Sequence, residues 1–478
     1  MPSVDPKIIL DPHPYAEEIL WKLEDVGHRA VIVGGAVRDL LRDRYEEEYT
    51  FDPRDLDIDI ATSAGPDEIR QLFSEFDFLE VGESFGVLIV ITPDEKQYEV
   101  AQFRTESKYD GRRPGEVKPT DSLKEDVRRR DFTVNGLALE REGRIIDYVG
   151  GISDLKQKLI KSIGDPLERF KEDYLRPLRG VRIACDIGGK IEPSTSEAMA
   201  KVADKVTSIS WERIREELFK ILGTRNSGWG MRFLKDKKFL EEIMPEMIAN
   251  EGVPQPKQYH PEGDVLEHSF QALEVADRLE FSPLTKLAVF LHDVGKAPAF
   301  DDSGGEHMGG HALTGERLAE RIATRLRLSN DQTKRLTWLV GNHMKGSILF
   351  RMRRAKQVKL IRHNQDKSSP LSQPISRFGY FADLLQVILA DSEASSHGVD
   401  GWLPVFEKFS ALLPHLKHLE NLGSARKLID GEDLLNLGME EGPRLGEVLK
   451  EVHEKIYSGE IDDRESALKF AEKLARED

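Results

Sequence analysis

Two aspartates separated by one residue are the side chains of this sequence best suited to chemistry. Asp57 and Asp59 lie in the stretch DLDIDIAT (Asp55–Thr62), where aspartates alternate with apolar residues. Because successive side chains of an extended strand point to opposite faces, we expect both carboxylates on one face of a buried strand. Neighbouring carboxylates repel each other unless a divalent cation or basic partners compensate. The pattern therefore favours a magnesium site that handles a nucleoside triphosphate.

A glycine pair upstream is a candidate phosphate site. The apolar run Ala30–Val33 leads into Gly34 and Gly35 and then into a helical stretch that contains Arg38. A Gly-Gly bend at a helix start lets backbone N–H groups approach phosphate oxygens, and the helix dipole and Arg38 add positive charge. Acidic strands and Gly-Gly turns are each common in proteins. Only their occurrence together indicates a nucleotide site.

Two further motifs could complete this site. Glu99 lies in the alternating stretch Gln97–Phe103 and is a candidate third carboxylate; an edge-strand glutamate that faces water is equally compatible with the pattern. Arg130 and Asp131 belong to the motif RRRDFTVN, which we expect to lie beside a helix start and to direct one arginine towards a triphosphate. A solvated charged face is the alternative.

These residues need a small α/β domain to position them. The patterns predict helices over residues 14–26 and 66–76, strands over 86–91, 97–103 and 145–147, a surface loop over 42–54, and a mobile loop over 104–121 that is rich in charge, Gly and Pro. No convincing strand alternation follows Asp165. We therefore expect the remainder of the chain to be helical.

The first helix of that remainder carries a regular charged row. In Glu172–Ala184, Asp173, Arg176, Arg179 and Arg182 recur every three residues, which places Asp173 and Arg176 close together on one helix face. A proline at position 177 inside this helix should kink it. A salt-bridge ladder on a solvated helix is the alternative interpretation.

Composition limits the class of protein. A chain of 478 residues with 39% hydrophobic residues can form several globular domains, and its net charge of −17 argues against indiscriminate nucleic-acid binding. Its single cysteine excludes an internal disulfide. Neither a signal segment nor an apolar run of about twenty residues is present, so we expect a cytoplasmic protein without a membrane partner.

Five motifs together resemble those of the bacterial class II tRNA nucleotidyltransferases, the CCA-adding enzymes, and of the related poly(A) polymerases. The motifs are GGAVRD with DLDIDIAT, RRRDFTVN, DYVGG, EDYLRPLR and SWERIREEL (Ser210–Leu218). They occur in the order of the family over the first half of the chain. Pro177 and a long linker between Arg38 and Asp57 depart from the pattern, which leaves the local geometry open.

The resemblance implies a role for each motif. Asp57 and Asp59 would be the catalytic residues that bind two Mg²⁺ ions, and Glu99 would be the third carboxylate. Asp173 and Arg176 would select the base. C and A each present an amine donor beside a ring-nitrogen acceptor, whereas U and G present the reverse arrangement. The remaining nucleotide-binding residues would be Gly34, Gly35, Arg38, Arg130, Asp131, Asn135, Arg179 and Arg182.

Four of the histidines and two of the aspartates in the second half of the chain are candidate metal ligands, each in a helical context. Their order resembles the HD phosphohydrolase family, whose ligands bind a divalent metal and activate water. The resemblance implies one metal site with nickel, manganese or iron as its ion, acting on 2′-nucleotides, 2′,3′-cyclic phosphates or terminal phosphates; a vestigial fold kept for packing and RNA contact is the alternative. The residues are His268, His292, Asp293, His311, His343 and Asp391.

Two later stretches are candidates for RNA contact. Arg351–Lys367 carries seven Lys or Arg residues against the single acid Asp366, which suits tRNA phosphates, although a solvated helix is equally compatible. The acidic, helical last seventy-eight residues resemble the tail that packs near the tRNA elbow in bacterial CCA-adding enzymes.

The fold class that follows is α/β plus all-α. We expect a polymerase-beta-like nucleotidyltransferase head (1–165), a helical base-reading neck (166–250), an HD domain (251–400) and a helical tRNA-binding tail (401–478). The expected function is template-free addition of CCA, at least of the terminal A, to the tRNA 3′ end from CTP and ATP. A poly(A) polymerase and an HD phosphohydrolase whose head only binds RNA are the rival hypotheses.

Overall fold

The chain forms two compact units, Met1–Ile243 and Met244–Asp478. The computed structural model describes residues 3–46, 49–79, 86–109, 114–256, 258, 260, 263–365, 369, 377–421 and 428–476. In this part of the chain, no helix is both long enough and apolar enough to cross a bilayer.

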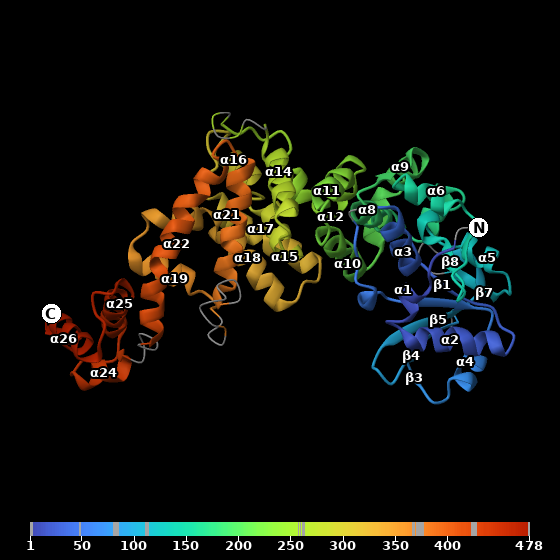
Figure 1. Ribbon diagram of the computed structural model, residues 1–478. Coiled ribbons are helices and arrows are strands. Elements are labelled where there is room, and N and C mark those ends of the chain that lie inside the picture. The colour runs from blue at the N-terminus through green and yellow to red at the C-terminus, as the bar shows by residue number, and fades with distance from the viewer. Residues whose placement is uncertain are drawn as a thin grey trace. The chain divides into compact units, whose positions relative to one another are not determined.

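A mixed sheet forms the centre of the first unit (Figure 1). Within the described residues its seven strands lie in the order β3 (Asp77–Leu79), β4 (Val87–Ile91), β5 (Gln97–Gln102), β2 (Asp59–Thr62), β1 (Ala30–Val33), β8 (Leu137–Leu139) and β9 (Ile145–Asp147). β2 and β5 pair in parallel, whereas the other neighbours pair antiparallel. Strand β1 is apolar and buried throughout, as expected for a central strand covered on both faces.

Helices cover this sheet and continue beyond it. α2 and α4 contact each other beside the sheet, and α3 packs on β1 and β8. The helices of the unit are α1 (Lys7–Leu10), α2 (Pro14–Asp25), α3 (Gly35–Tyr45), α4 (Pro66–Leu72), α5 (Leu123–Arg128), α6 (Gly151–Lys156), α7 (Pro166–Glu172), α8 (Arg176–Ile187), α9 (Pro193–Ala200), α10 (Trp211–Leu222), α11 (Ser227–Asp236) and α12 (Phe239–Ile243), with 3₁₀ turns at Pro53–Asp55, Thr133–Asn135 (η3) and Ala203–Ser208.

Several predicted elements of this unit are wrong. The segment 104–121 is not a loop: β6 (Arg104–Tyr109) and β7 (Pro114–Pro119) pair as an antiparallel hairpin, whose residues 110–113 lie outside the described residues. Thr105, Tyr109 and Val117 are residue types that favour strands, and strand pairing forms despite the Gly and Pro content of the segment. The segment 42–54 begins inside α3. Strand β11 (Lys190–Ile191), which pairs in parallel with β10 (Leu159–Ile160), lies beyond Asp165, where no further strand was expected.

Two predicted helix boundaries also differ. Arg128 ends α5, so the three arginines lie at a helix end rather than a helix start. Asp173 follows the end of α7 with extended backbone, and a new helix, α8, begins at Arg176. Pro177 therefore occupies the first turn of α8, where no backbone N–H is needed, and kinks nothing.

The second unit is helical in its described part. Its helices are α13 (Pro245–Ile248), α14 (Val265–Arg278), α15 (Pro283–Leu291), α16 (Lys296–Asp302), α17 (His311–Arg325), α18 (Asn330–Ser347), α19 (Arg354–Ile361), α21 (Tyr380–Ala394), α22 (Gly398–Asn421), α24 (Gly431–Asn436), α25 (Pro443–Ser458) and α26 (Arg464–Arg476), with a 3₁₀ turn at Leu349–Arg351.

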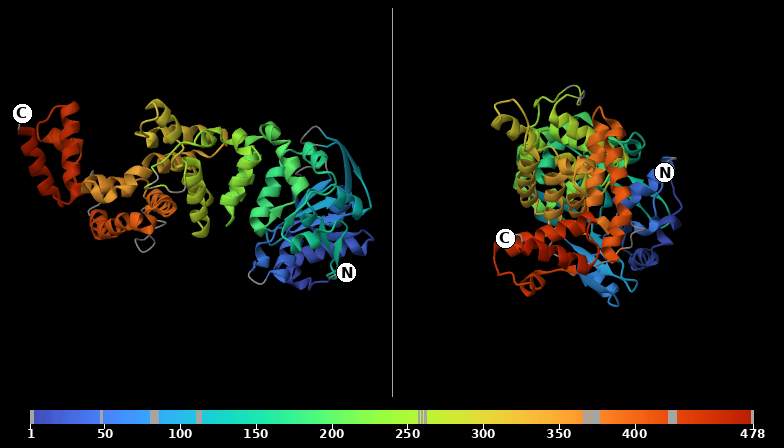
Figure 2. Two further views of the ribbon diagram at one scale, coloured as in Figure 1. Left: turned by 90° about the horizontal axis from the view of Figure 1, so that it is seen from above. Right: turned by 90° about the vertical axis from the view of Figure 1, so that its left-hand side faces the viewer.

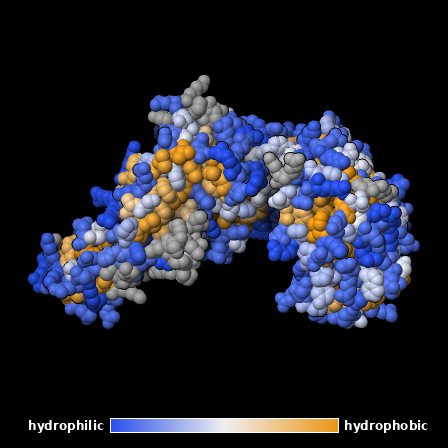
Figure 3. All heavy atoms as spheres, in the orientation of Figure 1, coloured by the Kyte–Doolittle hydropathy of each residue, from blue (hydrophilic) through white to orange (hydrophobic). Residues whose placement is uncertain are grey.

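Three contact patterns organise this unit. α14, α15, α18 and α21 pack on one another, and the last helices, α24 to α26, gather at the C-terminal end (Figure 2). α19 packs on α25. Apolar surface runs along α22, where Val399, Leu403 and Phe406 are exposed at helical spacing (Figure 3).

Candidate active site

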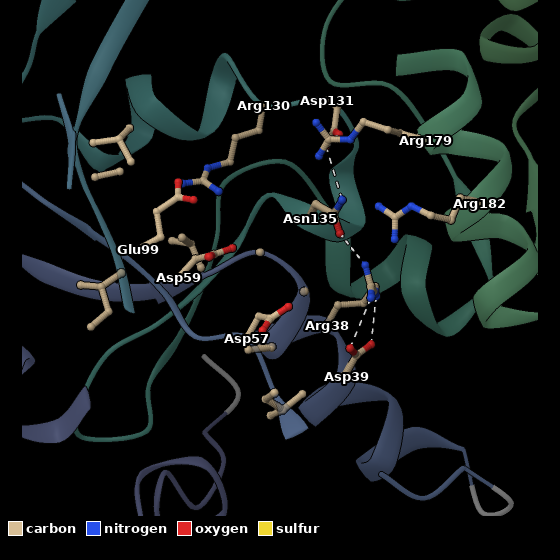
Figure 4. A pocket seen from close by; sticks show the side chains of 18 of the residues that line it. Arg38, Asp39, Asp57, Asp59, Glu99, Arg130, Asp131, Asn135, Arg179 and Arg182 are labelled. Atoms are coloured by element: carbon tan, nitrogen blue, oxygen red, sulfur yellow. Dashed lines mark hydrogen bonds and ion pairs between the residues drawn. The ribbon is translucent and has the colours of Figure 1, made fainter. Parts of the chain in front are cut away.

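Three carboxylates meet at one side of a cavity in the first unit. Asp59 begins β2, Glu99 is its direct neighbour in the parallel register of β5, and the exposed Asp57 precedes β2 by two residues. All three line a cavity of about 630 Å³ (Figure 4). The sequence placed Asp57 inside the strand, and the structure corrects this, because the strand begins only at Asp59.

These carboxylates are poorly compensated by protein groups. Within the described residues, none of the three side chains forms a hydrogen bond or an ion pair with another side chain. Burial and the nearby carboxylate of Glu99 raise the pKa of Asp59 to about 6, against the opposing effect of Arg130. Oxygen ligands that repel one another in this way suit a hard divalent cation.

The backbone of Gly34 and Gly35 lies beside these carboxylates. Gly34 has a positive φ of 78°, and a Cβ atom there would lie 3.3 Å from Oδ2 of Asp59. Only glycine therefore combines this turn with the close approach to the acidic strand. Gly35 begins α3, so the N-terminus of an eleven-residue helix borders the cavity.

Hydrogen bonds and an ion pair connect Arg38 to α8 across the cavity (Figure 4). Arg38 Nη1 donates to Asn135 Oδ1 (2.9 Å), Asn135 Nδ2 donates to Asp131 Oδ1 (3.4 Å), and Asp131 pairs with Arg179 (2.9 Å). Burial opposes ionisation of Asp131, but Arg179 outweighs it and lowers the pKa of that carboxyl. Arg38 also pairs with Asp39 (3.0 Å). The predicted nucleotide-binding residues of α3, η3 and α8 are thus positioned as one group.

Arg130 is held by a residue that the sequence analysis did not single out. The fully buried carboxylate of Asp126 accepts hydrogen bonds from Arg130 Nη2 (3.0 Å) and Arg129 Nε (2.8 Å). Both arginines line the cavity. Three residues missed by the sequence analysis, Arg104, Arg129 and Lys220, add further positive charge to the lining. Of these three, only Arg129 had a signal in the sequence, because it belongs to the run of three arginines at 128–130.

Asp173 and Arg176 do not pair through their side chains. Asp173 Oδ2 instead pairs with Arg213 of α10 (3.0 Å), and its Oδ1 accepts from the backbone N–H of Leu175. Arg176 lines the cavity and donates to the carboxylate of Glu172. The expectation that both residues lie on one helix face is therefore wrong, and the alternative of a salt-bridge ladder does not hold in this described segment, because the chain leaves the helix between the two residues.

The α10 helix also holds Arg182. Arg182 Nε donates to the buried Glu217 (2.8 Å), and its guanidinium points into the cavity from α8 (Figure 4). Arg213 and Glu217 are four residues apart and lie on one face of α10. This helix carries the motif SWERIREEL and packs on α8.

The six residues predicted for the HD site come together in the second unit. Their ligand atoms form two adjacent groups, each within 4.8 Å: one consists of His268, His292 and Asp391, and the other of Asp293, His311 and His343. Helices α14, α15, α17, α18 and α21 supply or immediately precede them. The sequence predicted one site for these six residues, and it did not predict their division into two groups.

The carboxylates of this cluster affect the protonation of its histidines. Burial opposes protonation of His292, but the carboxylates of Asp293 and Asp391 raise the pKa of His292 to about 10. Burial lowers the pKa of His343 to about 4. Nε2 of His292 lies 3.1 Å from Oδ2 of Asp293 and 3.6 Å from Oδ1 of Asp391, so carboxylate oxygens from both groups converge on it. The residues present therefore fit a divalent transition metal.

Three family models match the chain. The poly(A) polymerase head domain matches residues 30–161, the probable RNA- and SrmB-binding site of polymerase A matches residues 189–250, and the HD domain matches residues 265–372. Asp391 lies beyond the last match and reaches the HD cluster through the packing of α21. Nucleotidyltransferase and HD domains generally use divalent metals.

Relatives in sequence are CCA-adding enzymes. The chain is 30% identical to that of Streptococcus suis (strain 05ZYH33) over 453 residues, which cover 94% of each chain. It is 31% identical to that of Lactobacillus helveticus (strain DPC 4571) over 463 residues, 96% of each chain. It is 38% identical to that of Bacillus subtilis (strain 168) over 286 residues, 59% of this chain and 65% of that enzyme.

Solved structures share the fold. The CCA-adding enzyme of Bacillus stearothermophilus in complex with CTP aligns with a TM-score of 0.66 at 23% identity and covers 98% of each chain. The Thermotoga maritima CCA-adding enzyme complexed with tRNA aligns with a TM-score of 0.59 at 19% identity and covers 98% of this chain and 96% of that one.

Proposed function

Because this chain belongs to the CCA-adding enzymes, which are tRNA nucleotidyltransferases, we propose that its first unit adds CCA to the tRNA 3′ end from CTP and ATP. One observation supports the assignment of residues: three carboxylates that form no side-chain hydrogen bond or ion pair within the described residues line the same cavity as a group of arginines. Phosphoryl transfer needs this combination of positioning and charge stabilisation. The substrates are cytoplasmic molecules, and we propose a cytoplasmic enzyme.

The carboxylates are the proposed metal ligands. Asp57 and Asp59 would hold Mg²⁺, and Glu99 would act as the third carboxylate next to Asp59. Bound Mg²⁺ would stabilise the charge that develops on the phosphates and favour the deprotonated RNA 3′-hydroxyl. Gly34 and Gly35 would offer backbone N–H groups to the triphosphate.

Arginines would orient the nucleotide. Arg38 and Arg130 are fixed by Asn135 and Asp126, so their guanidinium groups are ordered before the triphosphate binds. Arg179 and Arg182 would complete the nucleotide site from α8, with Asp131 and Asn135 fixing their side of the cavity.

Base selection is proposed for Asp173 and Arg176. Arg213 holds the Asp173 carboxylate in one position, and Arg176 is buried and lines the cavity. A fixed carboxylate accepts from an exocyclic amine, and a guanidinium donates to a ring nitrogen. Both C and A offer this edge, so the pair would select CTP and ATP without a nucleic-acid template.

Single-nucleotide incubations test the proposed reaction. The protein is given tRNA that ends at the discriminator base, together with CTP, ATP, UTP or GTP alone or CTP with ATP. We expect two C additions with CTP and one further A when ATP is also present. Long tails from ATP alone would indicate a poly(A) polymerase. Binding of tRNA without any addition would support the rival hypothesis of an HD phosphohydrolase whose head only binds RNA.

A second activity is proposed for the HD cluster. The gathering of six metal-ligand side chains supports hydrolysis of 2′-nucleotides, 2′,3′-cyclic phosphates or terminal phosphates with bound nickel, manganese or iron. Incubation of 2′,3′-cyclic AMP with the protein and each metal tests this activity. Absence of hydrolysis with every metal and substrate class would support the vestigial interpretation.

The whole chain would use four regions, namely a head (1–165), a neck (166–250), an HD domain (251–400) and a tRNA-binding tail (401–478). A groove of about 880 Å³ between α19 and α25 is lined by Lys356, Lys359 and Lys450 and supports phosphate contact. Residues 366–367 of the predicted basic stretch lie outside the described residues.

The groove has its own test. Lys359→Ala should weaken tRNA binding at low salt and reduce the slope of log K against log salt by about 1, because one phosphate contact is lost. Lys469→Ala on α26, which removes an exposed lysine paired with Glu465, is the matched control. Equal salt slopes for the two variants would contradict a role of α19 in RNA binding.

A further inference from the structure

A second cavity of the first unit, of about 420 Å³, adjoins the segment that carries Asp131 and Asn135. The backbone N–H of Thr133 donates to the carbonyl of Lys161 (2.9 Å), and that of Ile163 donates to the carbonyl of Asp131 (3.0 Å). Asp131 lines the nucleotide cavity (Figure 4), whereas Thr133, Lys161 and Ile163 line the second cavity. One short segment of chain therefore connects the two cavities.

The polar residues that line this second cavity are three cations and two hydroxyl residues, namely Arg128, Lys161, Arg169, Thr133 and Ser162; we call it the Ser162 cavity. Among the described residues that line it, none carries a carboxylate, although the whole chain has a net charge of −17. Arg128 and Lys161 are exposed, and in the described part of the chain neither side chain forms an ion pair or a hydrogen bond. Their uncompensated charge should attract an anion.

Arg169 of α7 fixes the wall of the Ser162 cavity. Its Nη2 donates to the carbonyl of Arg128 (2.8 Å), and its Nε donates to the carbonyl of Ile163 (3.1 Å). Its Nη1 pairs with Glu172 on the same helix (2.8 Å). The end of α5 and the segment after β10 are thus held together before any ligand binds, which lowers the cost of ordering the site.

A buried hydroxyl group completes the set of donors. Ser162 is only 3% exposed, lines the cavity, and its Oγ has no hydrogen-bond partner in the described structure. The backbone N–H of Ser162 is already satisfied by Oγ1 of Thr195 (3.2 Å). A buried hydroxyl without a partner is unfavourable, and it can donate to the oxygen of a bound anion. Ser162 therefore points to a ligand independently of the exposed cations.

We propose that the Ser162 cavity binds a phosphate group of the bound tRNA. Phosphate oxygens accept hydrogen bonds and carry negative charge, so they match two cations and a hydroxyl donor without any carboxylate. Arg128 and Lys161 contact the phosphate oxygens, and Ser162 donates to one of them. The substrate of the adjoining nucleotide site supplies this group, so the inference rests on the proposed addition of CCA to tRNA.

The salt dependence of binding to tRNA that ends at the discriminator base tests the site in the full-length protein. Lys161→Ala and Arg128→Ala should each lower the slope of log K against log salt by about 1, and the double variant should lower it by about 2. Lys124→Ala is the matched control, because Lys124 is an exposed residue of α5 that does not line the cavity. Its slope should equal that of the wild type.

Conservative variants and kinetics separate a contact with RNA from a structural role. Lys161→Arg should restore the wild-type slope, because it keeps the charge. Ser162→Ala should weaken tRNA binding by about fivefold at every salt concentration without changing the slope, because a neutral hydroxyl group releases no counterion. In Lys161→Ala, KM for tRNA should rise while kcat and KM for CTP stay within about twofold of the wild type. Arg128→Ala serves if Lys161→Ala fails to fold, as judged by circular dichroism.

The outcomes separate this site from the proposed function. Unchanged slopes in both Lys161→Ala and Arg128→Ala, or an equal decrease in Lys124→Ala, would overturn the site. Loss of inorganic pyrophosphate binding in the two cavity variants, with unchanged slopes for tRNA, would assign the cavity to a free phosphate and overturn the contact with RNA. Absence of nucleotide addition by the wild type would contradict the proposed function, whereas lower slopes in the two variants would still support the RNA site.

Discussion

At Asp59, the ionised form that metal binding requires is unfavourable for folding. Its pKa is raised to about 6 from 3.8, so the folded chain binds this proton more tightly than the unfolded chain. The stability contributed by this group is therefore complete below about pH 4 and is lost as the pH rises towards 6. An ionised Asp59 costs the fold stability and is needed for metal binding, as expected of a catalytic carboxylate.

Asp59→Asn should separate these effects. We expect nucleotide addition to fall by at least about 1,000-fold, while the free energy of unfolding of the metal-free protein at pH 8 rises by roughly 1–2 kcal/mol. Urea denaturation and a CTP-addition assay measure the two effects. Asp57→Asn is the matched control, because Asp57 is exposed: addition should fall and stability should change by less than about 0.5 kcal/mol. Near wild-type addition by either variant would contradict the metal site.

The proton also competes with the metal at Asp59. For the wild-type protein at low Mg²⁺ concentration, the rate of C addition should fall as the pH drops through about 6, and higher Mg²⁺ concentrations should move the midpoint to lower pH. Initial rates over a pH series at several Mg²⁺ concentrations measure this shift. A midpoint that does not respond to Mg²⁺ would assign the titration to another group.

Base choice should depend on Asp173 and on Arg213, which pairs with it. Asp173→Ala should relax discrimination against UTP and GTP by about 1–3 kcal/mol. Arg213→Ala should act in the same direction, because Arg213 fixes the Asp173 carboxylate. Competition assays with mixed nucleotides measure the preference. Arg215→Ala, on the same helix, is the control and should keep it; unchanged preference with normal activity in Asp173→Ala would make the Asp173–Arg213 pair structural.

At the scale of elements, the β6–β7 hairpin is connected to the nucleotide site. Glu106 of β6 accepts from Arg104 Nε (2.6 Å) and from Arg129 Nη1 (3.2 Å), and the buried Asp126 joins Arg129 to Arg130. A movement of the hairpin would therefore reach the arginines of the cavity through ion pairs. One pocket that accepts C twice and then the larger A needs such a movable part.

Shortening the hairpin should stop the last step only. Replacing residues 108–115 by Asn-Gly closes the hairpin directly after the pair Ser107–Glu116 and preserves the register below it. We expect C addition to be largely retained and A addition to fall by about 100-fold or more. Gel analysis on tRNA lacking CCA and on tRNA ending in CC measures both steps. Equal loss of both would indicate misfolding, and normal A addition would make the hairpin a passive connection.

At the scale of the whole molecule, the two candidate sites lie in separate compact units. The residues of the nucleotide cavity all belong to Met1–Ile243, and the six HD residues all belong to Met244–Asp478. Separate hydrophobic cores and separate ligands allow the two chemistries to be removed one at a time.

A pair of variants tests this independence. His292→Ala with Asp293→Asn should abolish any metal-dependent hydrolysis of 2′,3′-cyclic AMP but leave CTP addition within about twofold of wild type, since changes at sites that share no residues act independently. Asp59→Asn should have the opposite effect. Loss of CTP addition in the HD variant, with its circular dichroism spectrum intact, would show that the units are coupled.

Local patterns in the sequence determined the chemistry of this protein. The acidic strand, the glycine turn and the ordered HD residues were recognisable because residue type and short spacing fix hydrogen-bonding and metal-binding capacity before the chain folds. Family membership, the mixed fold class and the candidate residues follow from such local information.

Tertiary structure decided how distant residues combine, because these relations depend on strand register and helix packing. Parallel pairing of β2 with β5 places Glu99 beside Asp59, and α10 supplies Arg213 to Asp173. The hairpin, expected to be a loop, depends on pairing between two strands that composition alone described as irregular. Packing of five helices divides the six HD residues into two groups, a distinction that linear order does not contain.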